Sequence, residues 1–235
     1  MNFGTLYLIP VPLAEDSISK TVPDYNVSVI NRIKTYIVEN EKTARRWLKE
    51  MGLTIPQSEL TLLPYGKHAD KSDSAFYLKA LLEGEDAGLM SEAGCPGVAD
   101  PGAGIVASAH EKGIKVVPLI GPSSILLALM ASGFNGQSFS FHGYLPIDKS
   151  QRSKKIKELE SQAERFNQTQ IFIETPFRNN QLLEEIIRNC KNSTRLCVAC
   201  NLSAADEQII SIPIEQWRKK KVDIHKKPAI FLLFK

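Results

Sequence analysis

The segment from Leu89 to Gly104 has the composition of a ligand-binding loop. It follows a predicted buried strand, precedes a predicted helix and holds four Gly and two Pro in sixteen residues. In an open parallel sheet, ligands bind beyond the carboxyl ends of strands, where small residues leave backbone N–H and C=O groups accessible. Strand-to-helix connections usually take about two to six residues. Because this one is longer, we predict a binding loop in preference to a plain turn.

A second segment whose residues could take part in catalysis is Glu-Thr-Pro-Phe-Arg, from Glu174 to Arg178. It follows another predicted strand. Glu174 could accept a proton or a hydrogen bond from a ligand amino group. Arg178 could hold a phosphate through two parallel hydrogen bonds. A simple ion pair between the two side chains is the alternative. We predict Glu174 and Arg178 as the catalytic residues.

Motifs for other chemistry are weak. The string Gly102 to Ala107 fits a GxGxxA dinucleotide pattern, but it begins well after its strand and has no acidic residue about 20 positions downstream. The sequence contains no GxxxxGK[ST] phosphate loop. Cys197 and Cys200 have CxxC spacing, yet residues three apart in a strand point to opposite faces. We therefore predict buried thiols and no metal site, and a nicotinamide-dependent dehydrogenase stays as a weaker alternative.

The elements that position these segments alternate regularly in the first half of the chain. Apolar, β-branched runs predict strands at 5–9, 35–38, 60–63, 87–90 and 115–119, and helical spacing predicts helices at 27–34, 42–51, 74–82 and 104–112. This alternation predicts an α/β fold with a parallel sheet and helices on both faces.

The alternation loosens after the turn Ile120-Gly-Pro122. Strands are expected at 139–142, 170–173, 196–199 and 230–234, with an apolar stretch at 209–214 and helices at 123–131, 150–165 and 179–189. This pattern predicts a smaller, mixed α/β domain. We divide the chain into an N-terminal α/β domain, 1–120, and a C-terminal mixed α/β domain, 121–235.

Composition excludes several classes of protein. The 235 residues are 43% hydrophobic and 23% charged, with a formal net charge of +3, which is ordinary for a globular protein and too weak to indicate a nucleic-acid or membrane partner. No run approaches the roughly 18 apolar residues of a membrane-spanning helix. The start of the sequence lacks signal-peptide features. We expect a cytoplasmic protein.

The basic residues nevertheless gather locally. Such groups are usually solvated surface, but near a binding cleft they could contact phosphate groups of a substrate. The predicted substrate-binding residues are Lys42, Arg45, Arg46, Arg152 and Lys154.

Five strings resemble those of one family, in the same order. They are Gly4 to Pro12, Ser91 to Pro96 with Asp100 to Gly102, Val117 to Ser124, His142 to Pro146 and Glu174 to Arg178. The chain in this respect resembles the tetrapyrrole (corrin/porphyrin) methylase superfamily, and most of all its bacterial small-subunit rRNA cytidine 2′-O-methyltransferase branch. The resemblance implies a homodimeric S-adenosylmethionine-dependent methyltransferase with its cofactor in a cleft between two α/β domains, acting on ribosomal RNA or the small ribosomal subunit.

The resemblance also implies which residues contact the cofactor. Ser123 and Ser124 could equally cap a helix, and Tyr144 and Leu145 could equally pack a domain junction. The full set is Pro10, Ser91, Glu92, Ala93, Gly94, Val98, Ser123, Ser124, Tyr144, Leu145 and Thr175.

Several positions depart from the family pattern. Glu92 and Asn40 stand where the family has Asp, and Cys200-Asn-Leu-Ser-Ala204 stands in place of Arg-Glu-Leu-Thr-Lys, with Asn201 and Ala204 replacing charged residues. The strings that would contact the cofactor thus match the family pattern better than the strings that would contact the substrate. The alternative function is a cofactor-binding member with a different, small-molecule methyl acceptor or with reduced catalysis.

Overall fold

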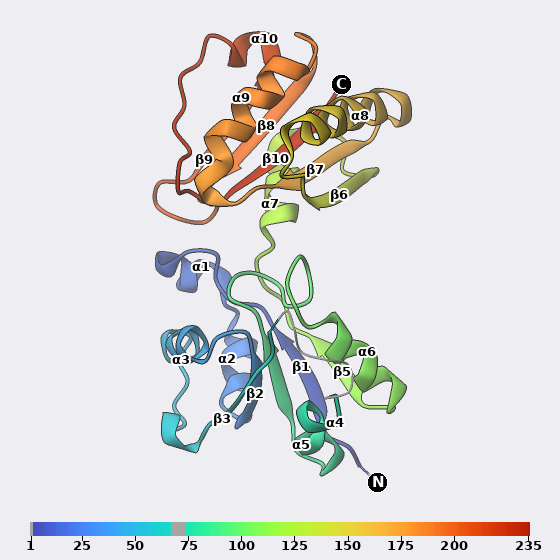
Figure 1. Ribbon diagram of the computed structural model, residues 1–235. Helices are drawn as coiled ribbons and strands as arrows, with labels where there is room; N and C mark the ends of the chain where they lie inside the picture. Colours follow the sequence, from blue (N-terminus) through green and yellow to red (C-terminus); the bar gives the residue numbers. More distant parts are fainter. Residues whose placement is uncertain (1, 67–73) are drawn as a thin grey trace. The chain divides into compact units, whose positions relative to one another are not determined.

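The structure is a computed structural model that describes residues 2–66 and 74–235 (Figure 1). The chain divides into two compact units, Met1–Ser123 and Ser124–Lys235, called unit 1 and unit 2 below. The domain boundary predicted from the sequence lies between residues 120 and 121, and the division in the structure follows Ser123. Each unit has its own sheet, and the described residues form one hydrophobic cluster on each face of the sheet in unit 1 and one cluster in unit 2.

Unit 1 is built on a parallel sheet. Its five strands in the described residues are β1 (Thr5–Ile9), β2 (Thr35–Val38), β3 (Thr61–Pro64), β4 (Ala87–Met90) and β5 (Lys115–Pro118), in the order β3-β2-β4-β1-β5. Every pairing is parallel. All residues of β2 and β4 are buried, as expected for interior strands covered on both faces. The predicted parallel sheet is confirmed.

Helices cover both faces of this sheet, and each face has a separate core. The helices are α1 (Ile18–Thr21), α2 (Asp24–Ile30), α3 (Glu41–Glu50), α4 (Ser74–Tyr77), α5 (Lys79–Leu82) and α6 (Ala103–Glu111), with 3-10 turns η1 (Glu15–Ser17) and η2 (Gln57–Glu59). Val29 and Trp47 belong to the core under α2 and α3, whereas Leu81 and Ile105 belong to the core under α5 and α6. Figure 1 shows these two groups on opposite sides of the strands.

Two helix predictions in unit 1 were wrong in their bounds. The helix expected at 27–34 begins at Asp24, because Pro23 adopts the extended conformation of an N-cap residue, and it ends before Asn31. The Asn31 amide then donates to the carbonyls of Val27 and Gly52. The helix expected at 74–82 is two short helices, α4 and α5, separated at Leu78.

Unit 2 contains the predicted mixed sheet. Its five described strands are β6 (Phe139–Tyr144), β7 (Thr169–Ile173), β8 (Arg195–Cys200), β9 (Gln208–Pro213) and β10 (Ala229–Phe234), in the order β6-β7-β10-β8-β9. Strands β6 and β7 are parallel, and the other pairs are antiparallel. The helices are α7 (Ser124–Ser132), α8 (Lys149–Phe166), α9 (Asn179–Asn189) and α10 (Ile214–Trp217), with η4 (Pro176–Arg178) leading into α9.

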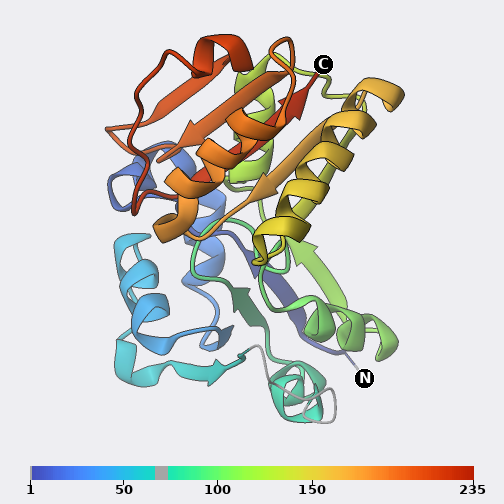
Figure 2. The same cartoon turned by 45° about the horizontal axis from the view of Figure 1, so that its top comes forward.

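The core of unit 2 lies between its sheet and the pair α8 and α9. Phe172 of β7 and Phe231 of β10 stack with ring centroids 5.9 Å apart, and Ile156 of α8 and Ile186 of α9 join the same cluster. Because side chains alternate along a strand, the neighbours of Phe231 face the other side, where α7 contacts β8, β9 and β10. Figure 2 shows α8 and α9 over one face and α7 on the other.

Candidate functional site

The parallel sheet of unit 1 brings three predicted cofactor-binding segments to one edge. Strands β4, β1 and β5 are neighbours, so their carboxyl ends lie side by side. Pro10 directly follows β1, Ser91 directly follows β4, and the residues up to Ser123 follow β5. This is the edge at which ligands bind in open α/β sheets.

The three loops at this edge are fastened to each other. Val11 and Gly94 exchange backbone hydrogen bonds of 2.9 and 3.0 Å, which form an isolated antiparallel bridge. The Cys95 thiol lies 3.4 Å from the carbonyl oxygen of Pro122. A Cβ on Gly121 would lie 2.3 Å from Cβ of Pro10, so only glycine fits there. The loops therefore form a defined surface.

The loop after β4 is anchored from behind and exposed in front. Ser91 and Gly94 are buried, and the Trp47 indole of α3 donates a 3.1 Å hydrogen bond to the carbonyl of Glu92. Glu92 and Ala93, between them, are exposed. Glu92 and Ala93 can thus meet a ligand, while the buried residues on either side of them are held in place. Sequence reasoning missed Trp47, whose only signal was its place on the apolar face of α3.

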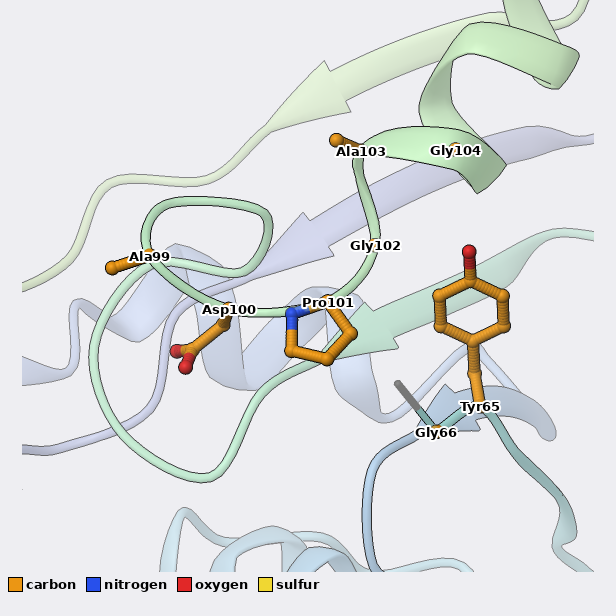
Figure 3. Close-up of a pocket in the computed structure, with 8 residues that line it drawn as sticks. All are labelled: Tyr65, Gly66, Ala99, Asp100, Pro101, Gly102, Ala103 and Gly104. Carbon is orange, nitrogen blue, oxygen red and sulfur yellow. The ribbon is translucent and has the colours of Figure 1, made fainter. Parts of the chain in front are cut away.

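The rest of the same loop borders a hollow of about 360 Å³ (Figure 3). Tyr65 and Gly66, which follow β3, form one side, and the other side consists of residues 99–104. A Cβ on Gly104 would lie 3.0 Å from the Tyr65 hydroxyl, and Gly102 has φ of 127°. The conformation of Gly102 favours glycine, and a side chain at 104 would require the Tyr65 hydroxyl to shift. Val98, a predicted cofactor contact, is exposed just before this stretch, and Tyr65 is a lining residue that the sequence analysis missed.

In unit 2 the ends of several strands place the predicted residues at one edge. Tyr144 ends β6 and pairs with Ile173 at the end of β7, and Ile173 in turn pairs with Ile230 near the start of β10. Glu174 and Thr175 come directly after β7. Tyr144 is 58% exposed. Leu145 is 3% exposed and belongs to the hydrophobic core of unit 2, so its side chain is not available to a ligand.

Glu174 and Arg178 form a partly buried ion pair. The Glu174 side chain is 1% exposed, and its Oε1 accepts hydrogen bonds from Nη2 of Arg178 at 2.6 Å and from the Thr175 N–H at 2.7 Å. Within residues 2–66 and 74–235, Oε2 of Glu174 and Nε of Arg178 are buried with no hydrogen-bond partner. One acceptor oxygen of the Glu174 carboxylate thus has no hydrogen-bond partner among the described residues. Buried polar atoms without a partner are uncommon, and one explanation for them is a role in function.

The turn that carries this pair is tied to the start of β10. Pro176 opens η4, and its carbonyl accepts a 2.9 Å hydrogen bond from the Lys226 N–H. The buried side chain of Asn179 donates to the carbonyl of Lys227 at 2.6 Å. These bonds fix the backbone on both sides of Arg178.

Comparison with known proteins identifies the family. The family model for Tetrapyrrole (Corrin/Porphyrin) Methylases matches residues 28–217. This chain belongs to the tetrapyrrole (corrin/porphyrin) methylase family. It is an S-adenosylmethionine-dependent methyltransferase, as the sequence analysis predicted.

Named relatives agree with this assignment, and a solved structure has a similar fold. "Ribosomal RNA small subunit methyltransferase I" of Pseudomonas aeruginosa is 28% identical over 217 residues, covering 92% of this chain and 72% of that protein. The protein of the same name from Bacillus subtilis is 33% identical over 182 residues, 77% of this chain and 58% of that protein. The methyltransferase CobJ, with TM-score 0.63 and 17% identity, covers 100% of this chain and 94% of its own, which supports the fold.

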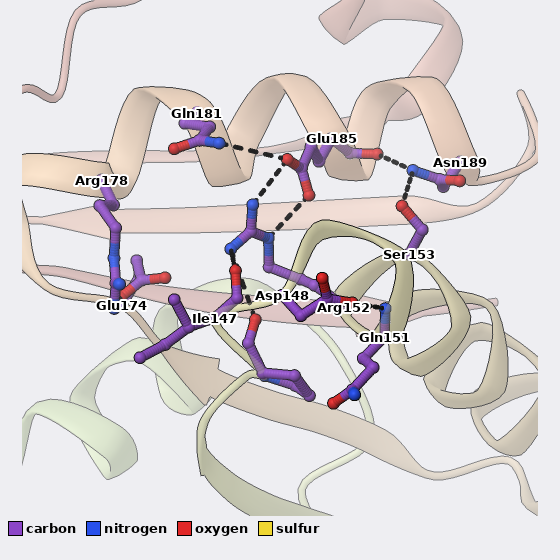
Figure 4. Close-up of polar contacts among 11 residues, drawn as sticks. Ile147, Asp148, Gln151, Arg152, Ser153, Glu174, Arg178, Gln181, Glu185 and Asn189 are labelled. Atoms are coloured by element: carbon purple, nitrogen blue, oxygen red, sulfur yellow. Dashed lines mark hydrogen bonds and ion pairs between the residues drawn. The ribbon is translucent and has the colours of Figure 1, made fainter.

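A predicted substrate contact of this methylase, Arg152, is corrected by the structure (Figure 4). Its side chain is 4% exposed, and its Nε and Nη2 each donate a 2.7 Å hydrogen bond to the carboxylate of Glu185 on α9. Nη1 donates to the carbonyl of Ile147 at 2.9 Å. The hydrogen bonds with Glu185 raise the pKa of Arg152 and lower the pKa of Glu185. Arg152 therefore has no free donor face for RNA and instead joins α8 to α9.

The other basic residues predicted to contact the substrate differ in whether their side chains already bond to other residues. Arg45 donates to the Gln57 carbonyl at 2.7 Å, and Arg46 pairs with Glu15 and lies over the Trp47 ring. Lys42 and Lys154 are exposed, with no ion pair in the described part of the chain. The methylase thus retains these two lysines as candidates, and the two arginines on α3 are committed to unit 1.

Three of the four cysteines are buried thiols, and Cys95 is half-buried. Cys190, Cys197 and Cys200 are free and buried, and burial raises the pKa of Cys197 to about 12. Across residues 2–66 and 74–235, no group of three metal-ligating side chains comes together. No helix there has the length and apolar character needed to cross a membrane.

Two of the positions that depart from the family pattern, Asn40 and Asn201, have structural roles. Asn40 caps α3 by accepting a 3.0 Å hydrogen bond from the Thr43 N–H. The Asn201 amide donates to Asp206 at 2.8 Å, and Lys227 pairs with the same carboxylate at 3.3 Å. Asn201 has φ of 50°, a left-handed conformation that Asn tolerates well. Ala204 and Cys200 provide no charge at this turn.

Proposed function

We propose that this methylase transfers a methyl group from S-adenosylmethionine to a ribose 2′-hydroxyl of small-subunit ribosomal RNA. The main support for this substrate is the similarity, over most of the chain, to relatives named as ribosomal RNA small subunit methyltransferase I, at 26–33% identity. Exposed lysines such as Lys42 and Lys154 support an anionic substrate.

The edge of unit 1 suits the cofactor. Glu92 and Ala93 are exposed and can meet the charged methionine end, and the loops beside Pro10 are fixed by the bridge between Val11 and Gly94. Pro10 itself has no N–H, so it can contribute only its ring and carbonyl. When bound, S-adenosylmethionine supplies a methyl group on a sulfonium whose thioether leaves without further activation. The chain must therefore mainly align the attacking oxygen.

A ribose hydroxyl must also lose its proton during transfer. Oε2 of Glu174 is a buried acceptor without a partner in the described structure, and the neighbouring Arg178 holds the other carboxylate oxygen. A carboxylate fixed in this way can accept a hydroxyl hydrogen bond and then the proton. We assign Glu174 as the proton acceptor and Arg178 as the residue that orients it.

A different methyl acceptor is the alternative, and one observation favours it. The family's charged string is replaced by Cys200 to Ala204, whose turn is stabilised internally through Asn201 and Asp206. Loss of those charges would suit a small-molecule acceptor or reduced catalysis.

We also propose that the protein works as a cytoplasmic homodimer. The support is the family resemblance together with the exposed apolar surface of α7, where Met130 is 77% exposed. Sedimentation equilibrium tests the dimer, and a single species of monomer mass at micromolar concentration would refute it.

The test of the substrate is methyl transfer from isotopically labelled S-adenosylmethionine. Wild-type protein is incubated with small subunits lacking ribose methylation, with the naked RNA, and with a tetrapyrrole. Nuclease digestion and mass spectrometry should find the label in one 2′-O-methylated cytidine. Label in the tetrapyrrole alone would support the alternative acceptor, and no label in RNA would reject the proposal.

A further inference from the structure

The first half of α8 borders a hollow lined almost entirely by polar side chains. The hollow measures about 590 Å³ and is lined by Asp148, Lys149, Ser150, Ser153, Lys154 and Lys157. These residues share one face of α8, since positions three and four apart on a helix are neighbours. The opposite face, with Arg152, Ile156 and Leu159, is buried in unit 2.

The positive charge on this face is not cancelled by the acidic residues of the same helix. Glu158 pairs with Lys155 at 2.9 Å, and Glu164 pairs with Lys191 at 2.7 Å. The buried Glu160 accepts hydrogen bonds from the Lys191 N–H and the Thr194 hydroxyl. Each of these carboxylates is therefore committed away from the hollow.

The three lysines of the hollow, by contrast, are exposed and uncommitted. Within the described chain, Lys149, Lys154 and Lys157 form no ion pair. The one carboxylate in the hollow, Asp148, accepts a 2.9 Å hydrogen bond from the Gln151 N–H as the cap of α8. The hollow thus combines three free ammonium groups with two serine hydroxyls, a set of donors suited to phosphate oxygens.

The position of this face is fixed by the buried pair described above. Arg152 bonds Glu185 with two hydrogen bonds and holds the Ile147 carbonyl just before the helix, as Figure 4 shows. The Asn189 amide also reaches the Ser153 hydroxyl at 3.4 Å. The backbone that carries the lysines is therefore held in place. When a ligand binds, the conformational entropy that is lost is that of the lysine side chains.

We propose that the hollow formed by Lys149, Ser150, Ser153, Lys154 and Lys157 is a phosphate-backbone docking surface for the RNA substrate. This inference rests on the proposed function, because it assumes a polynucleotide acceptor. It assigns to these lysines the binding of RNA and no part in cofactor binding or methyl transfer.

The test compares two triple variants with the same change in net charge. One is Lys149→Glu, Lys154→Glu, Lys157→Glu in the hollow, and the matched control is Lys219→Glu, Lys220→Glu, Lys221→Glu, at exposed lysines after α10. The binding of in-vitro-transcribed small-subunit RNA is measured against salt, and S-adenosylmethionine binding and thermal unfolding report on folding. The hollow variant should bind RNA about tenfold or more weakly, with a salt slope smaller by about 2, at roughly 0.7 for each lost phosphate contact.

The outcomes separate this inference from the proposed function. If the hollow variant binds RNA as tightly as wild type, or if the control loses as much affinity, the docking surface is refuted while RNA methylation by wild type still stands. If wild type neither binds nor methylates RNA, both proposals fail. Competition by inorganic phosphate at equal phosphate concentration would show a small-anion site instead and would also overturn the inference.

Discussion

The carboxylate of Glu174 accepts a 2.6 Å hydrogen bond from Arg178 through one oxygen, and its other oxygen is buried without a partner in the described structure. An ordinary surface ion pair leaves both partners in water and contributes little to stability. Here the carboxylate is 1% exposed, and its orientation is fixed by the Thr175 N–H as well. Arg178 and the Thr175 N–H therefore orient the Glu174 carboxylate as a proton acceptor.

Replacing Glu174 by Gln should abolish most methyl transfer. The amide keeps the size of the side chain but cannot take a proton, and general-base catalysis is worth about 10² to 10⁴ in rate. We expect kcat to fall about 100-fold or more, with little change in S-adenosylmethionine affinity by calorimetry. Glu215→Gln, at an exposed position on α10, is the control and should behave as wild type. Full activity of Glu174→Gln would remove this residue from the mechanism.

Adding a methyl group at Gly121 should disturb the cofactor edge. The new Cβ would lie 2.3 Å from Cβ of Pro10, so one of the two loops must move. We expect Gly121→Ala to cost about 1–3 kcal/mol of stability, as overpacking does, and to weaken S-adenosylmethionine binding. Gly136→Ala, where no atom lies within 4 Å of the added Cβ, is the matched control. Equal affinity in the two variants would show that the Pro10 loop does not contact the cofactor.

Breaking the pair of Arg152 and Glu185 should destabilise unit 2 selectively. Removing one partner leaves the other charge buried, which costs about 3–5 kcal/mol. Trp47 lies in unit 1 and Trp217 in unit 2, so fluorescence of a Trp47→Phe background follows the unfolding of unit 2 alone. In that background Glu185→Gln should lower the urea midpoint, and Arg152→Met with Glu185→Leu should restore much of it. A Glu185→Gln midpoint equal to that of the background would contradict the role assigned to the pair.

The same pair predicts a pH dependence. The hydrogen bonds from Arg152 lower the pKa of Glu185 in the folded state. A lowered folded pKa means that the contribution to stability is complete above the unfolded value, about 4.3, and is lost as pH falls through the folded value. The stability difference between the background and Glu185→Gln should therefore be constant at neutral pH and shrink in acid. A difference that grows in acid would have the wrong sign for this pair.

Thiol reactivity should distinguish the loop cysteine from the core cysteines. Burial raises the pKa of Cys197 to about 12, and Cys190 and Cys200 are also buried with raised pKa values. A disulfide reagent at pH 8 should modify Cys95 first, because it is only half-buried in the loop after β4. Bound S-adenosylmethionine should slow that reaction. Faster modification of Cys197 than of Cys95 would contradict the assigned environments.

Much of the fold was predictable because its strands are short, strongly β-branched runs bounded by Gly and Pro. The errors among the site residues arose where the contacts of a side chain are made with residues far along the chain. Arg152 looked like one more surface cation in a lysine-rich run, although its spacing to Ile156 and Leu159 placed it on the apolar face of α8. The partner on that face, Glu185, could not be identified from spacing because it lies on another helix. Tyr65 and Trp47 were missed for the same reason, since their site contacts are long-range.

The most direct test of the account is the crystal structure of the chain with S-adenosylhomocysteine, the product that remains after methyl transfer. The account predicts that the homocysteine end contacts the backbone of Glu92 and Ala93 and lies beside Pro10. A product molecule bound elsewhere, with the loops after β1 and β4 empty, would contradict the cofactor site at the edge of unit 1.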